Sequence, residues 1–178
     1  MMKKLSRPLY VKLTDFPDDR GWFAEIFNRS LFREHFGDDF ELVQANVSVS
    51  HQNVLRGLHY QTGRNAQAKI ISVLNGKILD VIVDLRQSSE TYGKSQQRVM
   101  SANDRGMLFV PIGYAHGFLS LEENTTIIYF VDADYDPSHE QSLHWNDGDL
   151  DINWNIANPI CSSKDQNAKS FRNCVKFP

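Results

Sequence analysis

The chain has 178 residues, of which 41% are hydrophobic and 23% charged, and its formal net charge is −3. This length predicts one domain, residues 1–178, with enough apolar side chains for a core. Both signs of charge are spread along the chain, which disfavours intrinsic disorder and a basic nucleic-acid-binding protein. We therefore expect a globular protein without a polyanionic partner.

The N-terminal segment has two lysines but lacks the apolar run and cleavage site of a secretory signal. No stretch approaches about 18 apolar residues, the minimum for a membrane-spanning helix. These features predict a soluble, cytoplasmic protein without a membrane partner. Its two cysteines, Cys161 and Cys174, match no metal-binding spacing, and we expect them to be free thiols in a reducing compartment.

Short β-branched and apolar runs separated by turn residues predict a mostly β protein. Only residues 29–36 have helical spacing, with Asn28 or Ser30 available as the N-cap and Gly37 after the last turn. Between two apolar runs, Asn75-Gly76 is the strongest hairpin signal because it tolerates the positive φ angles of a type I′ turn. Strands are predicted over residues 42–50, 54–61, 69–74, 77–85, 96–101, 107–110, 117–121 and 125–133.

The spacing of these strands is typical of a sandwich or barrel, and an antiparallel jelly roll is the simplest arrangement. After Tyr135 the chain becomes rich in Asp, Asn, Ser and Pro, with Trp145 and Trp154 as isolated apolar anchors. We therefore expect an all-β fold with a short N-terminal helix and a loop-rich C-terminal tail packed over the barrel. Neither a repeat nor a linker supports a second domain.

Several common catalytic motifs are absent from the sequence. It has neither GxGxxG nor a Walker loop, which disfavours nucleotide-dependent hydride or phosphoryl transfer, and it has no HExxH. His59 has no histidine two or four residues away. A metal site is therefore disfavoured, although His116 offers a distant second ligand.

Polar side chains cluster in segments that otherwise resemble strands. Residues 56–61 are Arg-Gly-Leu-His-Tyr-Gln, residues 44–48 are Gln-Ala-Asn-Val-Ser, and Lys69 begins an apolar run. An exposed strand face explains any one of them alone, but buried polar groups need partners or a cavity. Together they favour a ligand pocket inside the barrel.

For two further residues, His116 and Tyr129, the sequence is compatible with either a structural or a functional role. His116 lies in a glycine-containing connection where the backbone can approach a ligand closely. Strand alternation places Tyr129 on one face with Ile127 and Val131. A core tyrosine needs a partner for its hydroxyl, whereas a tyrosine facing a cavity can act as a general acid.

Taken in order, these segments resemble the dTDP-4-dehydrorhamnose 3,5-epimerase family of cupin-like sugar-nucleotide enzymes. The resemblance covers nearly the whole chain and depends on RGLHYQ at 56–61, AHGF at 115–118 and WND at 145–147 in this order. It implies a cupin-type antiparallel jelly-roll barrel that inverts C3 and C5 of a dTDP-4-keto-6-deoxyhexose without a cofactor. Such an enzyme would take part in the biosynthesis of dTDP-rhamnose for surface polysaccharide.

The resemblance also implies roles for four catalytic residues. His59 matches the base that abstracts the proton, and Asp165 matches the carboxylate that orients it. Lys69 is expected beside the C4 oxygen, where an ammonium would favour the enolate. Tyr129 matches the acid that returns a proton to the opposite face of the sugar.

Further residues are implied to bind the substrate. Arg20 and Arg56 match the clamps on the diphosphate, and Tyr135 matches the aromatic that stacks on thymine. The family also implies a homodimer, in which Arg20 and Glu25 can act in the neighbouring site. The other positions implied to line the ligand site are Gln44, Asn46, His116, Glu140 and Lys164.

One physical difficulty accompanies this assignment. In a regular strand Arg56 and His59 would point to opposite faces because their separation is odd. We therefore predict a bulge or local twist at Gly57.

Three alternatives stay open from the sequence. The same base and acid would serve an enzyme that inverts only C3 or only C5 of a related 4-keto nucleotide sugar. A noncatalytic sugar-nucleotide binding module would retain the barrel but has no evident need for an acid and a base. A metal-dependent cupin oxygenase or isomerase is the third.

Overall fold

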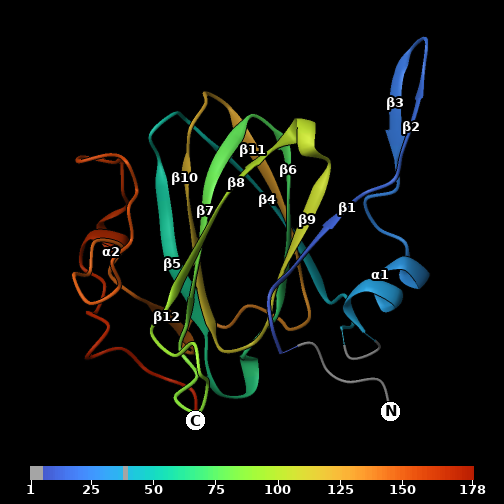
Figure 1. Ribbon diagram of the computed structural model, residues 1–178. Coiled ribbons are helices and arrows are strands. Elements are labelled where there is room, and N and C mark those ends of the chain that lie inside the picture. Colours follow the sequence, from blue (N-terminus) through green and yellow to red (C-terminus); the bar gives the residue numbers. More distant parts are fainter. Residues whose placement is uncertain (1–5, 38–39) are drawn as a thin grey trace.

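Two five-stranded sheets face each other and form the body of the molecule (Figure 1). The computed structural model describes residues 6–37 and 40–178. The first sheet has the order β1 (Leu9–Lys12), β9 (Gly106–Val110), β6 (Lys69–Asn75), β11 (Thr125–Val131) and β4 (Gln44–Ser50). The second has the order β12 (Glu140–Ser142), β5 (Leu55–Gln61), β10 (Tyr114–Ser120), β7 (Lys77–Asp84) and β8 (Ser95–Ser101). All strand pairs in both sheets are antiparallel, which confirms the predicted jelly-roll class.

A separate hairpin of β2 (Asp15–Asp18) and β3 (Gly21–Ala24) projects away from the barrel (Figure 1). It was not predicted, since each strand has only four residues and β2 contains Pro17. Two short 3₁₀ helices, η1 (Gly63–Asn65) and η2 (Ala102–Asp104), lie in connections. The C-terminal tail contains β12 and the one-turn helix α2 (Ser163–Gln166), neither of which was predicted.

Helix α1 (Arg29–Phe36) has the predicted bounds. The Asn28 side chain accepts hydrogen bonds from the N–H groups of Ser30 and Leu31, so Asn28 is the N-cap. Gly37 ends the helix with a φ of 88°. The buried face of the helix packs on the outside of the first sheet, where Phe32 contacts Phe130.

The core is layered because the central strands of both sheets are covered on both faces. Along β7, Ile78 and Ile82 point into the barrel, whereas Leu79, Val81 and Val83 point outward to the C-terminal tail. Buried Leu143 and Trp154 from the tail complete this outer layer, which confirms that the tail packs over the barrel. A strand covered on both faces has no polar alternation, and this explains why apolar residues on both faces of β7 are interrupted only by the buried Asp80 before the strand ends at Asp84.

The predicted hairpin at Asn75-Gly76 is wrong. β6 and β7 lie in different sheets: β6 pairs with β9 and β11, and β7 pairs with β8 and β10. A type I′ turn needs positive φ at both central residues, but only Gly76 has it, at 80°. The turn therefore leads the chain from one sheet to the other.

The remaining predicted strands are present with shifted ends. The largest shift is in β10, which begins at Tyr114 rather than 117, so His116 lies within a strand and not in the bent connection before it. Cys161 and Cys174 are free, as predicted.

Strand β5 is irregular at Gly57, as predicted. Gly57 has a φ of 124°, its peptide bond to Leu58 is cis, and the pairing of β5 with β10 shifts register here. Leu58 packs in the outer core, while both Arg56 and His59 line the cavity inside the barrel. The irregularity therefore lets two residues at odd spacing share the inner face.

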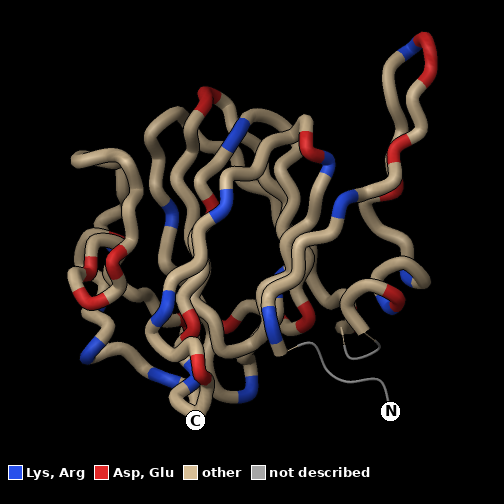
Figure 2. The backbone as a smooth tube through the Cα atoms, viewed as in Figure 1, with Lys and Arg blue, Asp and Glu red and all other residues tan. Residues whose placement is uncertain are grey.

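Charges of both signs are interspersed over the molecule in Figure 2, and the projecting hairpin carries acidic residues together with a basic one at its tip. Within residues 6–37 and 40–178, no helix is long and apolar enough to cross a membrane.

Candidate active site

A cavity of about 480 Å³ opens between the two sheets. Strands β5 and β10 supply one wall, β6 and β11 supply the other, and the segment before α2 closes one side. The lining therefore joins residues that are more than 100 positions apart. It consists of Val54, Leu55, Arg56, His59, Lys69, His116, Phe118, Tyr129, Ile160, Cys161, Ser162 and Asp165.

His59 and Asp165 form a hydrogen-bonded pair at the cavity wall. His59 Nε2 lies 2.5 Å from Asp165 Oδ1, and the Asp165 side chain is buried whereas that of His59 is partly accessible. Burial alone would raise the pKa of Asp165, but the hydrogen bond and charge of His59, the Ser162 hydroxyl and the Gly57 N–H together lower it. Asp165 is therefore held as a carboxylate that fixes the orientation of the imidazole.

Lys69 is the first residue of β6, on the opposite wall of the cavity from His59. Its ammonium donates to the backbone carbonyl of His59 at 3.4 Å. Burial lowers the pKa of Lys69 to about 8, Glu140 opposes this shift and Lys164 adds to it. The site therefore contains an ammonium group that is hydrogen-bonded to the backbone of His59.

Tyr129 reaches the cavity from β11. Its hydroxyl lies 3.4 Å from Ser48 Oγ, which is the partner that a tyrosine at this position was expected to need. Burial raises the pKa of Tyr129 to about 12. The phenol is therefore protonated at neutral pH, as a proton donor must be.

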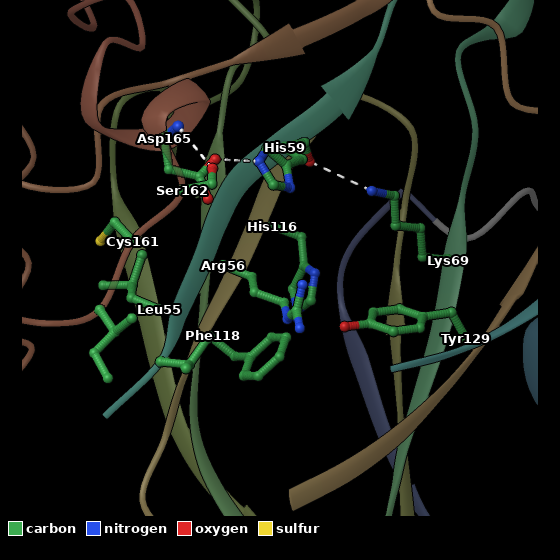
Figure 3. A pocket seen from close by; sticks show the side chains of 12 residues that line it. Leu55, Arg56, His59, Lys69, His116, Phe118, Tyr129, Cys161, Ser162 and Asp165 are labelled. Atoms are coloured by element: carbon green, nitrogen blue, oxygen red, sulfur yellow. Dashed lines mark hydrogen bonds and ion pairs between the residues drawn. The ribbon is translucent and has the colours of Figure 1, made fainter. Parts of the chain in front are cut away.

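The imidazole and the phenol come from opposite walls of the barrel. His59 belongs to the second sheet, and Lys69 and Tyr129 belong to the first. Figure 3 shows the His59–Asp165 pair on one side of the cavity and the Tyr129 hydroxyl pointing in from the other. A ring bound between them would have an imidazole on one face and a phenol on the other.

Arg56 lines the cavity (Figure 3), and its charge acts on Tyr129. Its Nε donates to Ser50 Oγ at 3.0 Å and one terminal nitrogen donates to the Val49 carbonyl at 3.2 Å. These contacts with β4 hold a permanently charged group at the cavity wall, suited to an anionic substrate group.

His116 is part of a second histidine–carboxylate pair, which the sequence prediction missed. His116 Nε2 lies 2.7 Å from Asp80 Oδ2, and both side chains are almost completely buried. The available signal was Asp80 itself, because a carboxylate inside the apolar strand 77–84 requires a partner. The pair fixes the ring of His116, which lines the cavity.

A chain of polar contacts continues from the cavity. Tyr135 donates to Glu140 at 2.8 Å, and Glu140 pairs with Lys164 at 2.5 Å. The charges of Glu140 and Lys164 both act on Lys69, and the charge of His59 acts on Glu140. These predicted residues therefore lie together around one side of the site.

On β4, Asn46 is the partner of Tyr129 in the strand register. Gln44 donates to Asn46 at 2.7 Å and accepts from the N–H of Tyr135. Gln44 and Asn46 therefore lie between Tyr129 and the exposed ring of Tyr135.

Two predicted residues, Arg20 and Glu25, lie away from the cavity and from the polar residues around it. Arg20 is at the tip of the β2–β3 hairpin, almost fully exposed and paired with Asp18. Glu25 follows the hairpin and lines a separate depression beside α1. Within the part of the chain that the structure describes, no group of three or more His, Cys, Asp and Glu side chains is arranged to hold a metal ion.

Comparison with known proteins confirms the resemblance noted in the sequence. The profile of the dTDP-4-dehydrorhamnose 3,5-epimerase family matches residues 3–173. The dTDP-4-dehydrorhamnose 3,5-epimerase of Shigella flexneri is 40% identical over 156 residues, which cover 88% of this chain and 86% of that protein.

Two solved structures show the same fold. The dTDP-6-deoxy-D-glucose-3,5-epimerase of Legionella pneumophila, in complex with dTDP-4-keto-L-rhamnose, superposes with a TM-score of 0.90 at 34% identity, covering 96% of this chain and 91% of that one. A 3'-monoepimerase of Streptomyces bikiniensis, in complex with dTDP-quinovose, superposes with a TM-score of 0.88 at 35% identity, covering 96% and 88%. Family profile, curated relative and fold agree, and this chain therefore belongs to the dTDP-4-dehydrorhamnose 3,5-epimerase family.

Proposed function

We propose that this protein inverts C3 and C5 of dTDP-4-dehydro-6-deoxy-D-glucose and so makes dTDP-4-dehydro-L-rhamnose, the intermediate from which dTDP-rhamnose for surface polysaccharide is formed. The observation that carries the proposal is the placement of His59 and Tyr129 on opposite walls of one cavity. Epimerisation removes a proton from one face of a carbon and returns one to the other. A base and an acid on facing sheets meet that requirement.

His59 takes the first proton. The C4 carbonyl makes the hydrogens at C3 and C5 acidic, and the imidazole nitrogen not bonded to Asp165 accepts one of them. The carboxylate of Asp165 then stabilises the imidazolium and prevents the ring from turning away.

Lys69 stabilises the enolate formed by this step. When the C–H bond breaks, its electron pair forms the C=C bond and negative charge moves to the C4 oxygen. An ammonium held beside that oxygen interacts more strongly with the enolate than with the ketone, so it lowers the barrier.

Tyr129 completes the inversion. Its phenol gives a proton to the face of the carbon opposite His59, and the enolate electrons return to the carbonyl. The same sequence at the second carbon, after the groups have exchanged protons with solvent, gives the doubly inverted sugar.

The nucleotide part of the substrate is assigned to the surrounding polar groups. Arg56 binds the diphosphate, and the exposed ring of Tyr135 stacks on thymine. Side chains that line the rest of the ligand site are Gln44, Asn46, His116, Glu140 and Lys164.

Arg20 and Glu25 are assigned to the site of a second copy of this chain in a homodimer. The position of Arg20 at the tip of a projecting hairpin supports this arrangement. The same hairpin exposes Phe16, Trp22 and Phe23, and the edge strand β4 exposes Val47 and Val49. Exposed apolar side chains on projecting and edge strands are typical of surfaces that another chain covers.

The two free thiols support an intracellular, reducing location. We assign the protein to the cytoplasm for this reason.

A second candidate function is inversion at C3 alone. It is favoured by the similarity to the Streptomyces bikiniensis 3'-monoepimerase, whose chain has nearly the same fold. One base and one acid on opposite walls would serve this reaction too.

Proton NMR in heavy water tests the proposal directly. The protein is incubated with dTDP-4-dehydro-6-deoxy-D-glucose, and deuterium incorporation and configuration are followed at C3 and C5. Inversion at both carbons is expected. Inversion at C3 alone would identify the second candidate, and binding without exchange would identify a noncatalytic module.

A Tyr129→Phe variant in the same assay tests the acid. It should retain exchange at the carbon that His59 deprotonates but lose most inversion, since only the opposite-face donor is removed. Undiminished inversion would show that another group, such as water or Tyr135, donates the proton.

A further inference from the structure

Strand β4 has two distinct faces. Gln44, Asn46, Ser48 and Ser50 alternate with Ala45, Val47 and Val49, and the two valines are exposed on the outside of the barrel. The polar residues therefore share the inner face. Although β4 is an edge strand, its inner side chains contact site residues: Ser50 accepts from Arg56 and Ser48 contacts Tyr129.

Ser48 is a diagonal neighbour of Tyr129 in the sheet. The register pairs Asn46 with Tyr129 and Ser48 with Ile127, so Ser48 is two residues along β4 from the position opposite the tyrosine. At this diagonal distance a long side chain still reaches its neighbour. The two oxygens are 3.4 Å apart, and either hydroxyl can donate.

Proton donation by Tyr129 leaves a phenolate in a buried setting. Burial raises the pKa of Tyr129 and thus opposes the phenolate, and the charge of Asp80 adds to this effect. The Ser48 hydrogen bond and the charge of Arg56 act in the other direction. Of these two stabilising groups, only Ser48 contacts the phenol oxygen by a hydrogen bond.

We propose that Ser48 is a positioning residue for the proton-return step: its hydroxyl donates to the oxygen of Tyr129, directs the phenol O–H toward the sugar and stabilises the phenolate that remains. When Ser48 donates, the hydrogen of Tyr129 is not used in the contact and is free to point into the cavity. The inference depends on the proposed role of Tyr129 as the acid.

The proton balance of this step is simple. The O–H bond of Tyr129 breaks and a C–H bond forms at the enolate carbon, while the enolate electrons restore the C4 carbonyl. Tyr129 becomes a phenolate that accepts the Ser48 hydrogen bond, and it regains a proton from water before the next inversion. His59 and the first proton abstraction are not involved, so Ser48 should affect only the return of the proton.

The test compares Ser48→Ala with Ser48→Thr, which keeps a hydroxyl, and with Ser95→Ala as a control. Ser95 lies on β8 in the other sheet and does not line the cavity. Solvent deuterium exchange, inversion, KM and kcat are measured for each variant, together with wild type and Tyr129→Phe. Thermal melting verifies the fold, and Ser48→Cys, with a weak donor of similar size, replaces the alanine variant if that one does not fold.

We expect Ser48→Ala to slow inversion by about 10- to 100-fold, the effect of one hydrogen bond to a charged group. Deuterium exchange and KM should stay near the wild-type values, and Ser48→Thr should recover most of the inversion rate. The pH dependence of inversion should also change in Ser48→Ala but not in Ser95→Ala.

Three results would overturn the inference. These are wild-type inversion in Ser48→Ala, an equal loss in the alanine and threonine variants, or a rise in KM at constant kcat, which would make Ser48 a substrate contact. The proposed function fails differently, through absence of epimerisation by the wild type or full inversion by Tyr129→Phe.

Discussion

At the scale of single residues, the site has two histidine–carboxylate pairs with different accessibility. His59 faces the cavity partly exposed, while its partner Asp165 is buried. His116 and Asp80 are both buried. A base must contact substrate, so the greater accessibility of His59 supports its proposed role in proton abstraction, whereas His116 is held in a fixed position at the cavity wall.

Replacement of His59 is the first residue-scale prediction. His59→Ala should reduce both deuterium exchange and inversion by about 10²- to 10⁴-fold, the usual contribution of a general base. NMR in heavy water measures both quantities in one sample.

The matched control is His51→Ala. His51 also contacts a carboxylate, Glu123, at 2.5 Å, but this pair is exposed and outside the cavity. An equal loss of exchange in both variants would indicate a general effect of histidine removal and would contradict the assignment of the base.

The second residue-scale prediction concerns pH. The pKa of Lys69 is lowered to about 8, so the ammonium is present below this pH and is lost as pH rises through it. If the ammonium stabilises the enolate, kcat should fall above about pH 8. Tyr129, with its pKa raised to about 12, stays protonated over this range and does not contribute to the fall.

A pH series of kcat on wild type and Lys69→Arg measures this effect. The guanidinium keeps its charge at all accessible pH values, so the variant should be slower but should lose the fall above pH 8. The same alkaline fall in both proteins would assign it to another group.

At the scale of elements, the sequence correctly predicted features that depend on residues close together in the chain. Helix α1 was predicted with its bounds, since Asn28 and Gly37 mark its ends through local backbone geometry. The irregularity at Gly57 was predicted from the incompatible spacing of Arg56 and His59. In contrast, the hairpin predicted at Asn75-Gly76 is absent. The strands on either side of this turn pair with strands that are distant in the sequence.

Gly57 gives a prediction at this scale. A Cβ there would lie 2.6 Å from Gly117 Cα and 2.9 Å from the His116 carbonyl oxygen, and a φ of 124° is unfavourable for any other residue. Gly57→Ala should therefore destabilise the fold by about 1–3 kcal/mol or more. It should also reduce activity, because β5 carries both Arg56 and His59.

Thermal unfolding compared with Gly148→Ala measures the effect. A methyl group added at Gly148 would meet no heavy atom within 4 Å, and this glycine needs no positive φ, so its alanine variant should unfold close to wild type. If both variants lost the same amount of thermal stability, the close contact of Gly57 with the backbone of β10 would not explain the effect.

At the scale of the whole molecule, the chain alone provides most of the proposed site but not Arg20 or Glu25. All four proposed catalytic residues lie at one cavity, although His59 and Asp165 are far apart in sequence and only the resemblance to a family brought them together beforehand. Asp80 and Ser48 were not assigned, since their partners come from other strands. One domain over residues 1–178 stays a prediction.

Complementation tests whether the hairpin completes a neighbouring site. His59→Ala and Arg20→Ala are each expected to be impaired. In a mixed dimer, one site would combine intact His59 with intact Arg20 from the other chain. After unfolding and refolding together, about a quarter of the sites should be intact if chains pair at random.

Sedimentation should show twice the mass of one chain, and activity of the mixture is compared with that of each variant refolded alone. A dimer whose mixture gains no activity would place Arg20 outside the partner's site. If the protein were a monomer, Arg20 could not act in the site of a second chain, and this proposal would be wrong.

The opposed walls of the cavity also have a consequence for stereochemistry. Because the proposed base and acid belong to different sheets, any carbon held between them is inverted, and the position of the sugar in the gap decides which carbon that is. A change in depth presents C3, C5 or both to the same pair of groups. Evolution can therefore convert a double inversion into a single one by reshaping side chains such as Phe118 and Ile160 that line the gap, with the proton-transfer groups unchanged.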